Sequence, residues 1–163
     1  MMNRFAMATM ALAAAMPAST AADAAGFHSY QNERFGFALD LPQGWRADPP
    51  PENGDGITLR GPEGGAVLIA FGRYASRPFP AEAAEFTAPQ PGETQTFAAR
   101  GADWLVASGT RGGSVYYRKA YLACAGGLLG ALSIEYAAAA KGRFDAIVTR
   151  VAKSFRPGAV ACR

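Results

Sequence analysis

Apolar and polar residues alternate along much of the chain, which predicts short β-strands. One strand is predicted over residues 34–41, where every second residue is apolar and one face is buried: Phe35, Phe37, Leu39 and Leu41. Further strand candidates, separated by turns rich in glycine, lie at 57–60, 66–71, 93–99, 104–108, 115–124 and 128–136. The spacing predicts a β-hairpin over 57–71 and an antiparallel meander over 93–136, with residues 46–56 as a loop.

The last part of the chain changes its period from two to that of a helix. Apolar residues recur there at helical spacing and form one stripe: Phe144, Ile147, Val148, Val151, Ala152 and Phe155. Pro157 and Gly158 end the pattern. An amphipathic helix of this kind packs on one face of a sheet, so the predicted fold class is α+β, an antiparallel sheet with a C-terminal helix on one face. Residues 81–86 form at most one or two helical turns among the prolines of segment 77–92.

Residues 1–25 have the composition of a signal peptide. Arg4 precedes an apolar run over 5–16, and small residues follow it. The run is too short to span a bilayer as a helix, and cleavage is expected between Ser19 and Gly26. The sequence therefore predicts a periplasmic or secreted protein with a single α+β domain over 26–163.

Export changes the expectation for the two cysteines, Cys124 and Cys162. An oxidising compartment favours a disulfide between them, which would tie the C-terminal tail to the sheet and contribute on the order of 3–4 kcal/mol in the loop-entropy description. The alternative is a buried Cys124 with a frayed tail.

Charge is distributed unevenly, with an excess of acidic residues over 25–110 and of basic residues over 111–163. Four basic residues lie on or just beyond the predicted terminal helix and form a candidate interaction surface: Arg143, Arg150, Lys153 and Arg156. Such a surface suits an anionic envelope partner or peripheral contact with an anionic membrane. A merely solvated surface is the alternative.

Residues that could carry catalysis or bind a cofactor or metal do not form a recognisable motif, so no catalytic residue, cofactor or metal is predicted. The one histidine, His28, is expected in a flexible terminus. Residues 116–119 are aromatic and basic, yet a strand explains them better than a nucleic-acid face in an exported protein. A small hydrolase that works without histidine would draw on carboxylates, for which the candidates are Glu33, Asp40, Glu63, Asp103 and Glu135.

Several segments together resemble small exported bacterial proteins of unknown function. The matching positions are Tyr30, Asn32, Arg34–Phe37, Pro42, Trp45, Asn53–Gly56, Pro62, Gly64, Ala66, Cys124, Tyr136, Phe144, Asp145, Ser154 and Phe155. That group is similar in element order to the PsbP-like fold, shared by an extrinsic photosystem II protein and a Ran-binding protein. The resemblance implies a protein that binds a partner and has no catalytic activity, although the prolines of 77–92 depart from the longer helix expected there. We therefore expect an exported binding module that uses its sheet edge or loops, with a membrane-binding basic helix and a small hydrolase as the alternatives.

Overall fold

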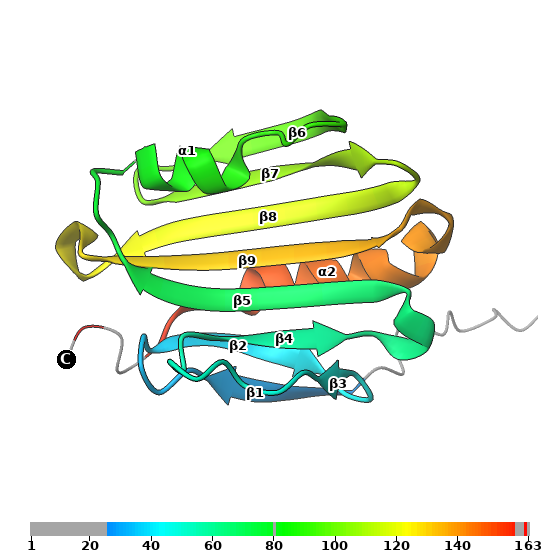
Figure 1. Cartoon of the computed structure of the whole chain (residues 1–163), viewed down its shortest axis with the longest axis horizontal. Coiled ribbons are helices and arrows are strands. Elements are labelled where there is room, and N and C mark those ends of the chain that lie inside the picture. The colour runs from blue at the N-terminus through cyan, green and yellow to red at the C-terminus, as the bar shows by residue number, and fades with distance from the viewer. Residues whose placement is uncertain (1–25, 80, 159–161, 163) are drawn as a thin grey trace, which may run out of the picture.

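The computed structural model describes residues 26–79, 81–158 and 162, and in them two antiparallel sheets and two α-helices (Figure 1). A three-stranded sheet has the order β1-β2-β10 and a seven-stranded sheet the order β3-β4-β5-β9-β8-β7-β6. The strands are β1 (Phe27–Gln31), β2 (Phe37–Pro42), β3 (Arg46–Ala47), β4 (Gly56–Arg60), β5 (Ala66–Tyr74), β6 (Glu93–Arg100), β7 (Trp104–Arg111), β8 (Ser114–Ala123), β9 (Leu128–Ala137) and β10 (Arg156–Pro157), and the helices are α1 (Ala81–Thr87) and α2 (Lys141–Ser154). The predicted signal peptide lies outside the described residues.

The predicted meander and hairpin are confirmed. Strands β6, β7, β8 and β9 pair in chain order, and β4 pairs with β5. β5 returns to pair with β9, so the hairpin and the meander form one sheet. The loop prediction for 46–56 is corrected at its ends, because Arg46 and Ala47 pair with β4 as β3 and Gly56 begins β4.

The expectation of a flexible terminus around His28 is wrong. Residues 27–31 form β1, which pairs along its whole length with β2, and His28 lies opposite Leu41 with its side chain exposed. The predicted strand at 34–41 begins instead at Phe37, after a tight turn in which Gly36 has φ +64°. Only a residue without a side chain adopts that backbone conformation at little cost.

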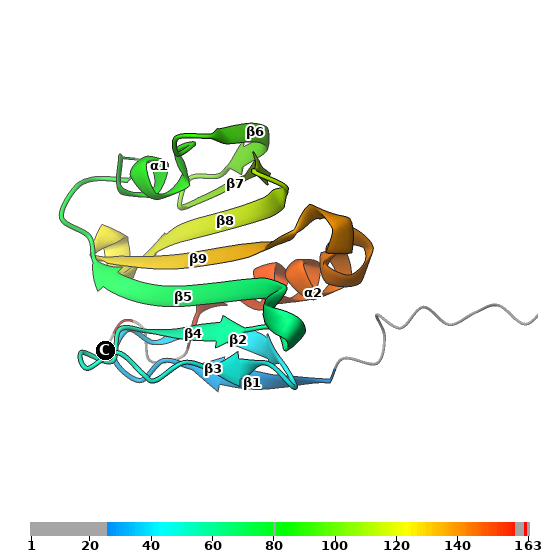
Figure 2. The same ribbon diagram turned by 45° about the vertical axis from the view of Figure 1, so that its right-hand side comes forward.

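Helix α2 and the three-stranded sheet lie on the same face of the seven-stranded sheet and enclose the main core (Figure 2). The predicted helical stripe is confirmed, since all six of its members from Phe144 to Phe155 are buried. They pack against Phe37 and Leu39 of β2 and against Leu132 and Ile134 of β9. The α+β class and the helix packed on one face are therefore confirmed.

Helix α1 covers the opposite face, over β7 and β8. It is short, as the prolines around it predict, and the apolar cluster beneath it is small: Ala83, Ala120, Leu122 and Leu129 are its buried members. A single sheet thus separates a large apolar core from a minor one.

Candidate functional site

The core face of the seven-stranded sheet is only partly covered. The three-stranded sheet and α2 lie over β4, β5, β9 and β8, and strands β7 and β6 extend beyond them. Two hollows lie between α2 and these outer strands. One, here called the aromatic cavity, has a volume of about 430 Å³ at the C-terminal end of α2, and the other, the helix groove, has about 630 Å³ along the helix. Tyr117, Ala152 and Lys153 line both, so the two hollows adjoin.

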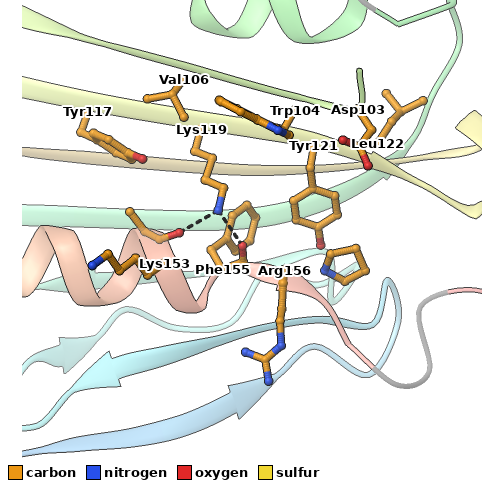
Figure 3. A pocket seen from close by; sticks show the side chains of 12 residues that line it. Asp103, Trp104, Val106, Tyr117, Lys119, Tyr121, Leu122, Lys153, Phe155 and Arg156 are labelled. Carbon is orange, nitrogen blue, oxygen red and sulfur yellow. Dashed lines mark hydrogen bonds between the residues drawn. The ribbon is translucent and has the colours of Figure 1, made fainter. Parts of the chain in front are cut away.

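Four aromatic side chains form the wall of the aromatic cavity: Trp104, Tyr117, Tyr121 and Phe155 (Figure 3). Trp104 lies opposite Tyr121 in the pairing of β7 with β8, and Tyr117 lies four residues before Tyr121 on the same strand, so all three project from one face of the sheet. A side chain at Gly130 would come within 2.3 Å of the Tyr121 ring, so this ring lies directly on the β9 backbone. Alternate residues of β7 and β8 therefore build an aromatic surface at the point where α2 ends.

Lys119 is the polar centre of the cavity. Its Nζ donates hydrogen bonds to the carbonyl oxygens of Ala152 at 2.7 Å and Phe155 at 2.9 Å, as Figure 3 shows. Carbonyls at a helix C-terminus lack partners within the helix, and a cation there also suits the helix dipole. Burial lowers the pKa of Lys119. Among the described residues no carboxylate forms an ion pair with it.

The tyrosines of the cavity remain neutral over a wide range of pH. Burial raises the pKa of Tyr117 to about 12 and raises that of Tyr121 as well. The Tyr121 hydroxyl is buried and has no hydrogen-bond partner within the described part of the chain. The cavity therefore offers apolar ring surface together with the half-buried ammonium group of Lys119.

The four basic residues singled out in the sequence are divided by the structure. Arg150 donates to Asp40 at 3.0 Å and lies over the ring of Phe27, so its charge is partly neutralised. Arg143 lies over Phe144, near the other end of α2. Lys153 and Arg156 line the aromatic cavity and are exposed.

The helix groove contains a small polar network. The Tyr136 hydroxyl donates to Asp145 at 3.0 Å, and Lys141 donates to the same carboxylate at 2.5 Å. Its hydrogen bond with Lys141 is the main reason that the pKa of Asp145 is lowered, whereas burial and the contact with Asp145 raise the pKa of Tyr136 to about 12. These partners satisfy one another, so the network fixes the start of α2 against β9.

Two buried carboxylates lie on the opposite face of the sheet. Glu82 of α1 accepts hydrogen bonds from the backbone of Ser76 and Arg77 and from the Ser76 hydroxyl, and it forms an ion pair with Arg73. Glu93 receives a two-pronged contact from Arg118, with N···O distances of 2.8 and 2.6 Å, and both side chains are at most 7% exposed. The Glu93–Arg118 pair could not be predicted from the sequence, because neither residue type is expected in the interior. Both carboxylates have ion-pair partners, and they link α1 and β6 to the rest of the sheet.

Three of the five candidate residues for hydrolysis lie in separate parts of the fold, and the side chain of Glu63 is not among those that the structure describes. Asp40 pairs with Arg150 in the three-stranded sheet, Glu135 pairs with Arg111 on β9, and Asp103 lies at the edge of the aromatic cavity. His28 lies on β1, in the three-stranded sheet. Within the described ranges no group of three or more His, Cys, Asp or Glu side chains could hold a metal ion, and no helix is long and apolar enough to span a membrane.

The predicted disulfide is present between Cys124 and Cys162, with a Cα–Cα distance of 5.2 Å. Cys124 follows the end of β8 rather than lying within the strand, and its φ of +56° marks the sharp turn toward β9. The bridge therefore joins the tail to the β8–β9 connection.

Comparisons with known proteins give a fold and no sequence family. No family model and no curated protein matches the sequence. The solution structure of cyanobacterial PsbP (CyanoP) from Synechocystis is similar over 90% of this chain and 98% of that one, with a TM-score of 0.61 and 15% identity. The Ran-binding protein Mog1p of Saccharomyces cerevisiae is similar over 82% of this chain and 96% of that one, with a TM-score of 0.56 and 9% identity. The PsbP-like fold implied by the sequence is thereby confirmed.

Proposed function

We propose that the protein is an exported, non-catalytic module that binds an extended segment of a partner protein along strand β6. The observation that carries this proposal is an edge strand with exposed apolar side chains. β6 is the last strand of its sheet, and within the described residues only β7 pairs with it. An unpaired strand edge is a ready template for another strand, and many binding domains use it in this way.

The middle of the edge lacks two of the usual features that prevent strand addition, charge and proline. Residues 94–99, TQTFAA, contain neither a charged residue nor a proline. A β-bulge interrupts the pairing between Gln95 and Phe97, and the pairing from Phe97 to Arg100 is regular. We therefore assign the docking segment to Phe97–Arg100, beyond the bulge.

Apolar side chains accompany this segment on one face of the sheet. Phe97 is 53% exposed and Trp104 is 38% exposed. Phe97 lies opposite Ser108, and Ser108 and Trp104 occupy alternate positions of β7, so Phe97 and Trp104 project toward the uncovered core face. Backbone pairing would supply affinity, and apolar side chains of the partner that contact these rings would supply specificity.

Two further observations support the proposal. The buried Glu93–Arg118 pair anchors the beginning of β6, so the edge is ordered before a partner arrives, which lowers the entropic cost of binding. A fold shared with a Ran-binding protein is compatible with partner binding, although fold alone does not determine function. Periplasmic or secreted localisation is part of the proposal and draws on the disulfide and on the predicted signal peptide.

Chemical cross-linking of the mature protein in envelope extract tests the proposal. Phe97→Lys should abolish the cross-link to a partner, because it puts a charge on the docking segment. Ile69→Lys is the matched control, since Ile69 is 40% exposed in the same sheet and faces the side of α1. A partner cross-linked equally by both variants and by the parent protein would contradict docking at β6.

Anionic membrane binding is the second candidate function. Lys153 and Arg156 favour it, because both are exposed and neither pairs with a carboxylate among the described residues. Binding to anionic vesicles should weaken steeply with salt and disappear when Arg143, Arg150, Lys153 and Arg156 are all replaced by Gln. Vesicle sedimentation at low salt that recovers no protein would exclude this candidate.

A further inference from the structure

The aromatic cavity has an excess of positive charge that the protein itself does not balance. Three cations line it, Lys119, Lys153 and Arg156, against one acidic residue, Asp103. Basic side chains elsewhere commonly have a carboxylate partner: Arg60 pairs with Asp48, and Arg111 with Glu135. None of the three cavity cations forms an ion pair with a carboxylate in the part of the chain that the structure describes.

The three cations lie beside apolar side chains, in a cavity whose volume suits a small molecule. The volume of about 430 Å³ falls within the range of small-ligand pockets, roughly 300–1,000 Å³. Trp104 and Tyr117 supply ring faces, and the half-buried ammonium of Lys119 uses two of its three N–H groups on the carbonyls of α2. One N–H remains for a ligand at the point where the rings meet the charge.

We propose that the aromatic cavity binds a small anionic amphiphile, a molecule with one acidic head group and an apolar chain or ring. The acidic group pairs with Lys119 and with Lys153 or Arg156 at the cavity mouth. The apolar part lies against the aromatic wall, where its removal from water favours binding. This site goes beyond the proposed partner binding, because it involves the cavity at the end of α2. It shares Trp104 with the proposed partner contact and leaves the unpaired edge of β6 free.

Tryptophan fluorescence provides a direct test. The chain has two tryptophans, Trp45 and Trp104, so Trp45→Phe leaves the cavity residue as the only reporter. Decanoate, kept below its micellar range, should change Trp104 emission in a saturable manner. Decyltrimethylammonium and decyl maltoside have the same chain length and different head groups. Their affinity should be lower by a factor of about ten or more, because they cannot form the charge-assisted hydrogen bonds.

Removal of the positive charges at the cavity mouth should also lower the affinity for decanoate. In the double variant Lys153→Gln/Arg156→Gln decanoate affinity should fall by about tenfold. Arg34→Gln/Arg46→Gln removes the same charge away from the cavity and should leave the affinity unchanged. Lys119→Met should also weaken binding, and thermal unfolding of that variant shows whether it is folded. Equal affinity for all three head groups, or no saturable response from a folded protein, would overturn the proposal.

Vesicles of phosphatidylglycerol distinguish the source of the amphiphile. If Lys119→Met weakens both vesicle binding and decanoate binding, membrane lipid supplies the ligand, and if it weakens only decanoate binding, the ligand is a free amphiphile. Phe97→Lys should leave decanoate binding intact in either case. Loss of partner cross-linking and loss of decanoate binding are therefore separate outcomes.

Discussion

The two faces of the seven-stranded sheet are stabilised in different ways. The face under α2 contacts a continuous apolar core that includes the three-stranded sheet, whereas the face under α1 contacts a small apolar cluster and two buried carboxylates with ion-pair partners. Apolar burial is non-directional and tolerates an incompletely covered edge, which is where the aromatic cavity and the β6 edge lie. Ion pairs and hydrogen bonds fix position and depend on pH. The α2 face therefore provides stability together with open binding surface, and the α1 face fixes the position of β6.

The largest expected effect comes from a charge placed in the core of the α2 face. Val148 is 8% exposed, and Val148→Asp would bury an unpaired carboxylate there. The cost of several kcal/mol is comparable with a total stability of about 5–15 kcal/mol, so the variant should be unfolded by circular dichroism. Thr149→Asp, at the next and exposed position of α2, should remain folded. Equal damage from the two changes would mean that the helix buries a different side.

On the α1 face, breaking the buried pair should cost somewhat less. Arg118→Met leaves the buried Glu93 with only the more distant Arg111, at 3.9 Å, and should lower the free energy of unfolding by about 3–5 kcal/mol. Replacing both residues, as Arg118→Met/Glu93→Leu, removes the unpaired charge and should recover most of that loss. Urea denaturation of the single and double variants measures the coupling. A double variant as unstable as the single one would show that the pair is not what orders β6.

Acid should loosen the α1 face before the α2 face. The hydrogen bonds from Ser76, with the Arg73 charge and the Arg77 backbone, hold the pKa of Glu82 at about 2, against an ordinary value of 4.5. Because the folded-state pKa is the lower one, this stabilisation is present above pH 4.5 and is lost as the pH falls toward 2. Hydrogen exchange across this interval should show α1 losing protection while α2 keeps it. Glu82→Gln should flatten the pH dependence, whereas Glu85→Gln, on the exposed side of α1, should preserve it.

The smallest effect concerns two tyrosine hydroxyls on the core face of the sheet. Tyr121 has a buried hydroxyl without a partner among the described residues, so Tyr121→Phe should raise the free energy of unfolding by about 1 kcal/mol. Tyr136→Phe removes a hydrogen bond to Asp145 and should lower it by about the same amount. Urea denaturation should show changes of opposite sign in the free energy of unfolding of the two variants. A decrease in both would mean that the Tyr121 hydroxyl has a hydrogen-bond partner in solution.

Local periodicity explains what could be predicted from the sequence. The stripe from Phe144 to Phe155 repeats at helical spacing, so it predicted both the helix and its buried face. In contrast, β1 has only two partly buried apolar residues, Phe27 and Tyr30, and its pairing depends on β2 rather than on its own pattern. A strand that is stabilised mainly by its neighbour need not have a strong alternating pattern of its own, so it is hard to predict from the sequence.

The candidate sites depend on contacts between segments that are distant in the chain, and these contacts could not be predicted from the sequence. Tyr117, Lys119 and Tyr121 are alternate residues of the strand predicted over 115–124, which implies a shared side. Ala152 and Phe155, whose carbonyls contact Lys119, are more than 30 positions away in the sequence. Likewise, Arg150 belonged to the predicted basic surface, and only the fold brings it to Asp40, 110 positions earlier. Side-chain types can be counted from the sequence, whereas their partners follow from topology.

The Cys124–Cys162 bridge also determines how the molecule responds to mechanical load. It closes a covalent ring that contains β9 and α2, two central elements of the fold. A pulling force applied to the end of the chain would pass through the bridge into the β8–β9 connection and bypass α2. The helix would therefore be shielded from tension for as long as the bridge remains oxidised.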